Sequence, residues 1–115
     1  MKIDVLKSKI HRATVTGANL NYIGSITLDE HLMKSAGLYE YEKVHVFNLS
    51  NGNRLETYVI RGEDGSGDVC INGAAAHLVK KGDQVIIVAF CSIDESLAGS
   101  FKPIIVHVNE NNKIS

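Results

Sequence analysis

Short apolar runs rich in Val, Ile and Thr recur along the chain, and turn residues separate each run from the next. This pattern predicts a succession of short β-strands. Asn51-Gly52 lies between two of these runs and tolerates the positive φ values of a tight turn, which predicts a hairpin. The expected strands are 2–6, 12–16, 43–49, 54–60, 68–71, 84–90 and 104–108.

Two short helices are expected between the strands. The first spans residues 30–36, with Asp29 as its N-cap and Gly37 after its end. The second spans residues 74–80 and is terminated by Gly82. The polar segment 109–115 reads as a frayed tail. The pattern therefore predicts one mainly β domain with short helices, and closing its sheet into a small barrel would remove exposed edges.

Composition and charge narrow the function classes. The chain is 44% hydrophobic and 22% charged with a net charge of −1, so it has no basic surface for nucleic acid. The longest apolar run, 85–91, is far shorter than the about 20 residues that cross a bilayer. The N-terminus lacks the continuous apolar run of a signal peptide, so we expect a cytoplasmic protein without membrane contact.

Motifs for familiar chemistry are missing. No two of the five histidines have i, i+4 spacing, and no metal site is expected. Cys70 and Cys91 lack CxxC spacing and read as free buried thiols. There is no GxSxG nucleophile motif, and the segment 62–68 (GEDGSGD) reads as a solvated turn.

The dipeptide Gly-Ser occurs three times, so its surroundings must distinguish the copies. Gly65-Ser66 lies among glycine and acidic residues, and Gly99-Ser100 lies in a polar stretch. Gly24-Ser25 lies between NLNYIG and the strand-like SITL, so only this pair can be held rigidly. By itself it also fits a tight turn before a strand.

Three blocks carry a family resemblance: SKIHRATVTGANLNYIGSITLD, NGNRLETY and INGAAAHLVKKGD. In this order they resemble the pyruvoyl-dependent aspartate 1-decarboxylases over nearly the whole chain. The resemblance implies a double-psi β-barrel and a homotetramer with active sites between subunits. It also implies self-cleavage between Gly24 and Ser25, giving a small chain 1–24 and a large chain 25–115.

The implied reaction converts L-aspartate to β-alanine and carbon dioxide for pantothenate and coenzyme A synthesis. Its cofactor is a covalent pyruvoyl group made from Ser25, without metal or pyridoxal phosphate. Such a ketone accepts the electrons that decarboxylation leaves on the α-carbon, which no ordinary side chain can do. Tyr58 is the implied proton donor, and Thr57 takes part in processing.

Further positions match the family's site. The implied substrate-binding residues are Lys9, Arg54, Thr57, Asn72, Gly73, Ala74 and Ala75, and the implied pocket residues are His11, Tyr22 and Phe47. The chain departs from the family at Ser8, where glycine is common, and at Phe47, where some members carry tryptophan. Phe47 changes a detail of the pocket wall.

Side-chain chemistry suggests a role for several of these residues. The Arg54 guanidinium suits bidentate binding of a carboxylate, and Lys9 is the second candidate. On a regular strand Arg54 and Tyr58 share a face about 13 Å apart, while Thr57 points to the other face. Thr57 would need an irregular strand or a site shared between subunits, and we predict a subunit interface at residues 54–58.

Two alternatives remain open. A barrel of the same fold could be a binding module that never cleaves. A pyruvoyl enzyme could instead act on a different amino acid.

Overall fold

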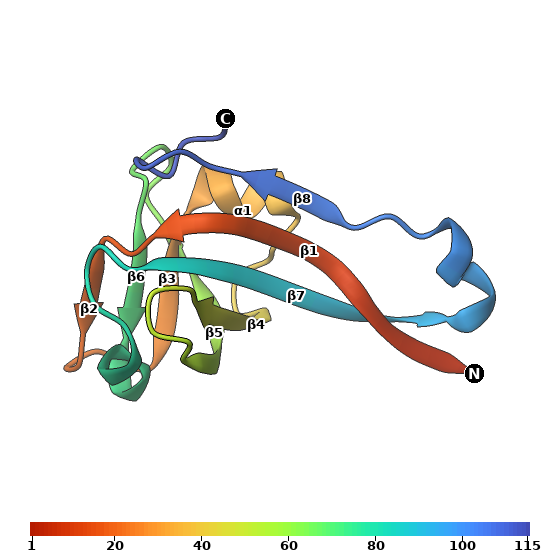
Figure 1. Ribbon diagram of the computed structural model, residues 1–115, viewed down its shortest axis with the longest axis horizontal. Coiled ribbons are helices and arrows are strands. Elements are labelled where there is room, and N and C mark those ends of the chain that lie inside the picture. Colours follow the sequence, from red (N-terminus) through yellow and green to blue (C-terminus); the bar gives the residue numbers. More distant parts are fainter.

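A computed structural model describes all 115 residues of the chain. Eight strands, one α-helix and two 3-10 helices make up the fold (Figure 1). In chain order they are β1 (Lys2–Thr14), β2 (Gly17–Asn19), β3 (Ser25–Asp29), α1 (Glu30–Ala36), β4 (Lys43–Asn48), β5 (Arg54–Gly62), β6 (Val69–Asn72), η1 (Gly73–Leu78), β7 (Gln84–Asp94), η2 (Glu95–Ser100) and β8 (Ile104–His107).

The strands close into a barrel because β2 follows β1 after only two residues. The sheet order is β2-β6-β3-β5-β4-β7-β1-β8. β1 pairs with β7, and after two residues its continuation β2 pairs with β6. The Thr16 backbone N–H donates to the Val69 carbonyl at 2.8 Å at this corner. The ring β1/β2-β7-β4-β5-β3-β6 is therefore complete, and β8 lies outside it along β1.

Alternating apolar residues fill the barrel. On β3, Ile26 and Leu28 are fully buried, and they alternate with Ser25 and Thr27. Burial of one such aliphatic side chain stabilises the fold by about 1.5–3 kcal/mol. The inward residues belong to one core cluster of 20 buried residues, to which α1 adds Leu32. The alternation fixes which side chains of each strand face outward.

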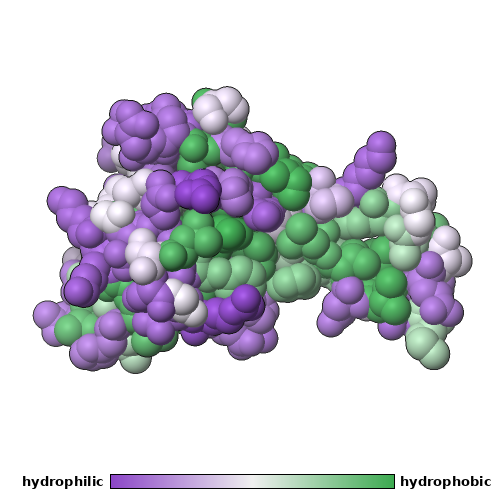
Figure 2. All heavy atoms as spheres, in the orientation of Figure 1, coloured by the Kyte–Doolittle hydropathy of each residue, from purple (hydrophilic) through white to green (hydrophobic).

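The N-terminal end of β1 and the C-terminal end of β7 extend beyond the barrel as an arm that carries η2 (Figure 1). The molecule is therefore 43 Å long but only 28 and 25 Å across. Apolar side chains are exposed toward this arm, among them Phe90, Leu97, Ile104 and Ile105. Figure 2 shows apolar surface between the barrel and the arm. No helix of the structure has the length and apolar character to span a membrane.

Several predictions from the sequence are confirmed, including a mainly β chain with short helices. The helix at Glu30–Ala36 has the predicted bounds, with the Asp29 side chain accepting from the His31 N–H and Gly37 left-handed at φ 67°. The predicted hairpin joins β4 to β5, with Gly52 at φ 79°.

Other predictions are wrong. The expected strand 2–6 and residues 12–14 of the expected strand 12–16 are parts of one strand, and the expected helix at 74–80 is the 3-10 helix Gly73–Leu78. The C-terminal segment is not frayed, because Asn112 is 1% exposed. Its side chain bonds both backbone groups of Thr14 and the Gly67 carbonyl.

Candidate active site

Ser25 is the first residue of β3 and lies opposite Asn72 on β6. Ser25 is only 4% exposed, so its hydroxyl is surrounded by protein. The Ser25 Oγ–H donates to the Ile23 carbonyl at 3.2 Å, and Oγ accepts from Asn72 Nδ2 at 3.0 Å. The hydroxyl beside the Gly24-Ser25 peptide bond is therefore fixed from two sides.

A close backbone contact holds the residue before Ser25. Gly73 has φ 75°, and a Cβ on it would lie 2.6 Å from the Gly24 Cα and 2.7 Å from the Gly24 nitrogen. Only glycine fits there, both in conformation and in space. Gly24 itself is less constrained, because a Cβ there would lie 4.0 Å from the Asn72 carbonyl oxygen. The steric requirement for glycine thus falls on Gly73.

Thr57 and Tyr58 lie on the strand next to Ser25. β3 and β5 are parallel, with Ile26 opposite Val59. Continuing this register backward places Tyr58 beside Ser25 and Thr57 beside Gly24. β5 pairs with β4 without a bulge from Arg54 to Tyr58. The strand is therefore regular, and Thr57 lies on the opposite face of β5 from Tyr58.

We call Gly24, Ser25, Asn72 and Gly73 the cleavage cluster. Thr57 and Tyr58 lie beside this cluster on β5, and Tyr22, Ala74 and Ala75 are close to it in sequence. The loop residue Tyr22 is 64% exposed, although its carbonyl oxygen lies 3.2 Å from a Cβ built on Gly73. On η1, Ala74 is exposed and Ala75 half-buried.

Arg54 and Lys9 are separated from Ser25. The Arg54 guanidinium lies over the Phe47 ring on β4, 4.3 Å from its centroid, and therefore turns away from β3. Lys9 lies on β1, where it pairs with Val88 on β7, and β1 does not pair with β3. We call Lys9, His11, Phe47 and Arg54 the anchor face.

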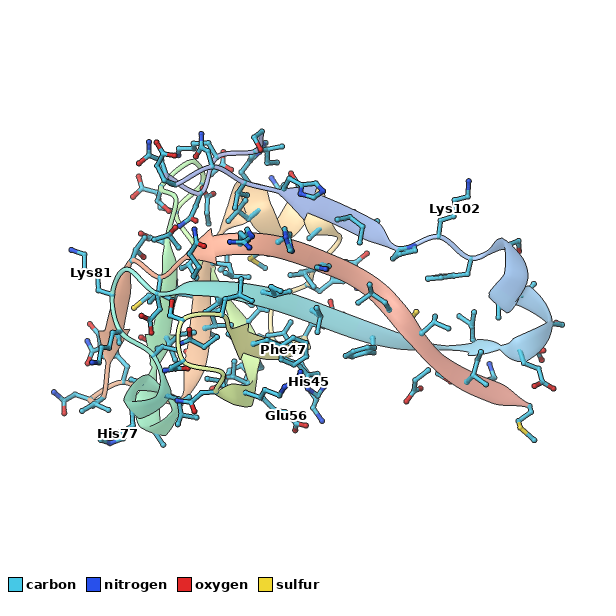
Figure 3. All side chains as sticks on the ribbon, in the orientation of Figure 1. His45, Phe47, Glu56, His77, Lys81 and Lys102 are labelled. Carbon is cyan, nitrogen blue, oxygen red and sulfur yellow. The ribbon has the colours of Figure 1, made fainter.

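A hollow of about 490 Å³ lies at the anchor face, lined in part by Phe47, Arg54 and His45. His45 Nδ1 lies 3.7 Å from Glu56, which Lys43 also approaches at 3.3 Å. Figure 3 shows His45, Phe47 and Glu56 together on the outside of β4 and β5, apart from His77 on η1. None of the three hollows of the chain is lined by a residue of the cleavage cluster.

His11 occupies a strained part of β1. Its Nδ1 is buried without a hydrogen-bond partner, and its ring meets His107 edge-on at 5.6 Å. The next residue, Arg12, has φ 64° at an irregularity of the β1–β7 pairing. Burial lowers the pKa of His11, and the charges of Lys9 and Arg12 lower it further.

Thr27 and Cys70, which bond to Asn72 near Ser25, were not predicted from the sequence as site residues. Asn72 Nδ2 also donates to Thr27 Oγ1 at 3.1 Å, and Cys70 Sγ donates to Asn72 Oδ1 at 3.5 Å. Burial raises the pKa of the Cys70 thiol, and the Asp68 charge raises it further. Strand alternation places Thr27 on the same face as Ser25, and Cys70 on the same face as Asn72. This signal could identify the two residues only once the pairing of β3 with β6 was known.

The class of protein defined by this geometry is a small closed β-barrel that buries the serine of a Gly-Ser pair and packs the glycine of the pair against a second glycine. A family model described as Aspartate decarboxylase matches residues 1–115. The chain is 63% identical over 114 residues to "Aspartate 1-decarboxylase" of Caldicellulosiruptor bescii, covering 99% of this chain and 89% of that relative. The protein of the same name from Clostridium kluyveri is 59% identical, covering 99% and 90%. The chain belongs to the aspartate decarboxylase family.

Among solved structures, the computationally designed msDPBB_sym2 protein matches with a TM-score of 0.48 and 20% identity, covering 74% of this chain and 96% of that chain. We draw no conclusion from so distant a likeness. The double-psi arrangement of the barrel stays a prediction from the family resemblance.

Proposed function

We propose that this chain cleaves itself between Gly24 and Ser25 and then decarboxylates L-aspartate to β-alanine and carbon dioxide, a product for pantothenate synthesis. The family membership supports the reaction. The observation that carries self-cleavage is the buried Ser25 hydroxyl, fixed beside a peptide bond whose glycine is pressed against Gly73. The large chain 25–115 would then begin at the modified Ser25.

Self-cleavage balances without any co-reactant except water. Ser25 Oγ attacks the Gly24 carbonyl carbon, the C–N bond breaks, and the hydroxyl proton passes to the Ser25 nitrogen, leaving an ester. Loss of the Ser25 Hα and cleavage of the Cβ–Oγ bond release the Gly24 carboxylate and leave dehydroalanine. The proton lost from Cα is regained at the methylene carbon to give an imine, water adds to the imine carbon, and ammonia departs to leave the ketone.

Thr57 is suited to the first of these steps. When the Gly24 carbon becomes tetrahedral, its oxygen bends away from the attacking hydroxyl. The β3–β5 register supports a position for Thr57 beside Gly24, on the face opposite the side chains of Ser25 and Tyr58. A hydroxyl there can donate to the developing oxyanion, and the loss of such a donor costs about 10²–10³ in rate. A regular β5 is thus compatible with a role for Thr57.

The residues present fit a pyruvoyl group at position 25. The cradle at Gly73, which a Cβ would fill, leaves backbone room at the new chain end. When formed, the ketone supplies an electron sink for the α-carbon of the substrate. Tyr58, one register step from Val59 and beside Ser25, would return a proton to that carbon.

We further propose a homotetramer in which the anchor face of one copy meets the cleavage cluster of another. Lys9 lies on β1, which does not pair with β3, and the Arg54 guanidinium is turned onto Phe47, so neither candidate anchor lies on a strand face next to Ser25 in its own chain. Exposed apolar side chains near the arm, such as Phe90 and Ile105, favour contact with another copy. The cytoplasmic location expected from the sequence also stays a proposal.

Intact-mass spectrometry of the purified chain tests the proposal. The expected result is two fragments, 1–24 and 25–115, with the larger one lacking the serine amine and carrying a ketone. Turnover is then compared for aspartate, glutamate and histidine, and only aspartate should give fast release of carbon dioxide. A chain that stays intact after warm incubation would favour the non-cleaving binding module.

A further inference from the structure

Four polar side chains form a square on one face of the β3–β6 pair. The register places Ser25 opposite Asn72 and Thr27 opposite Cys70. Alternation points all four to the same side, while Ile26 and Ile71 between them enter the core. The square therefore lies directly beside the Gly24-Ser25 bond.

The amide of Asn72 is the centre of this square. Its Nδ2 donates two hydrogen bonds, to Ser25 Oγ at 3.0 Å and to Thr27 Oγ1 at 3.1 Å. Its Oδ1 accepts from the Cys70 thiol at 3.5 Å. All of these polar atoms are thereby paired in one orientation of the amide.

Rotation of the amide by half a turn would exchange its oxygen and nitrogen. The oxygen would then face Ser25 Oγ, whose own hydrogen is already donated to the Ile23 carbonyl. The amide hydrogens would face the Cys70 sulfur, a weak acceptor. Cys70 as donor therefore favours the orientation in which Asn72 donates to Ser25, and Thr27 Oγ1 accepts the second amide hydrogen in that orientation.

We propose that Thr27 and Cys70 are positioning residues for self-cleavage, because together they orient the Asn72 amide so that its N–H group is directed at Ser25 Oγ. This role rests on the proposed function. The raised pKa of Cys70 is in keeping with it, because the thiol keeps its proton at neutral pH.

The Asn72 N–H group contributes to self-cleavage in two ways. It fixes the position of Oγ next to the Gly24 carbon before attack. When the Cβ–Oγ bond breaks, the electron pair of that bond goes to Oγ, which leaves as part of the Gly24 carboxylate. A hydrogen bond to an oxygen that gains charge strengthens during the reaction and so lowers the barrier.

The test measures the cleavage rate of newly made chains. Each chain is synthesised in a cell-free reaction, purified and incubated, and the uncleaved fraction is followed by intact-mass spectrometry. Thr27→Val and Cys70→Ala each remove one hydrogen bond and should slow cleavage about three- to tenfold. Thr27→Ser keeps the hydroxyl and Cys70→Ser puts a hydroxyl donor in place of the thiol, so both should cleave within about twofold of the parent.

Cys91→Ala is the matched control, because Cys91 is a half-buried thiol on β7 and pairs with Val5 on β1, away from the square. It should cleave at the parent rate. The serine variants separate positioning from packing, because they retain a hydrogen-bonding group while they lose the volume of the methyl group or of the sulfur atom. They also keep the proposal testable if Thr27→Val or Cys70→Ala fails to fold.

The outcomes are distinguishable. Parent-rate cleavage of Thr27→Val and Cys70→Ala would overturn the positioning role and leave the proposed function intact. Slow cleavage of both folded serine variants would also overturn it, because packing would then explain the effect. A parent chain that never cleaves would defeat the proposed function itself, and the positioning role with it.

Discussion

The cleavage cluster and the anchor face differ in how the fold holds them. In the cluster, Ser25, Asn72 and Gly73 are buried, and Ser25 and Asn72, 4% and 5% exposed, are hydrogen-bonded to each other within one chain. On the anchor face Arg54 is exposed and rests on the Phe47 ring beside an open hollow. A reaction within one chain needs only internal order, whereas binding a substrate needs groups that remain accessible. The two regions should therefore fail separately when each is altered.

The largest expected effect comes from Ser25→Ala in the cleavage cluster. The variant has no hydroxyl to attack Gly24, so cleavage and decarboxylation should both disappear while the barrel remains folded. Intact mass, carbon dioxide release and circular dichroism measure the three properties. Any two-fragment product from this variant would place the cleavage elsewhere.

Arg54→Gln on the anchor face should have the complementary effect. Self-cleavage should proceed at the parent rate, because the Arg54 guanidinium lies over the Phe47 ring on β4, on the side of β5 away from β3. Loss of a charge-assisted bond to the substrate should lower kcat/KM about 100-fold, mainly through KM. Arg61→Gln is the control, because Arg61 pairs with Glu30 on α1 and should leave both rates unchanged. Slow cleavage of Arg54→Gln would break the separation between the two regions.

Gly73→Ala tests the steric part of the cleavage cluster. The added Cβ would meet the Gly24 backbone, and the positive φ of residue 73 disfavours any side chain. We expect cleavage to slow about tenfold or more and unfolding to become easier by about 2 kcal/mol. The Gly24→Ala variant should disturb the structure less, because its Cβ meets no atom closer than 4.0 Å. Equal melting temperatures for Gly73→Ala and the parent would contradict this reading.

The sequence predicted much of the fold because strand alternation and turn residues are local signals. Helix α1 was correct to the residue because Asp29 and Gly37 mark its ends. The short strand β2 and the ordered tail were missed, because both depend on distant partners. Asn112 is held by Thr14, 98 positions away, and no local pattern reveals that contact.

The site divides in the same way. The family resemblance pointed to Ser25, Arg54 and Asn72, but Thr27 and Cys70 become visible only through the register of β3 and β6. The distance of Lys9 from Ser25 likewise depends on strand order, which the sequence does not reveal.

The smallest expected effect is a pH dependence of stability on the anchor face. The pKa of His11 in the folded chain is below its value of 6.5 in the unfolded chain, so the unfolded chain binds the proton first. The contribution of His11 to stability is therefore present above pH 6.5 and is lost as the pH falls below it. The melting temperature of the parent should fall slightly more between pH 7.5 and 5.5 than that of His11→Phe. An identical fall in both would show that His11 does not contribute to the pH dependence of stability.

Mixing two inactive chains tests the central claim most directly, namely that one copy supplies the cleavage cluster and another the anchor face. Ser25→Ala keeps the anchor face, and the double variant Lys9→Gln with Arg54→Gln keeps the cleavage cluster. If sites are shared between subunits, co-expression should restore about a quarter of the parent activity, because that share of the sites combines two intact regions. Activity no higher than that of the separately purified variants would show that each chain builds its site alone.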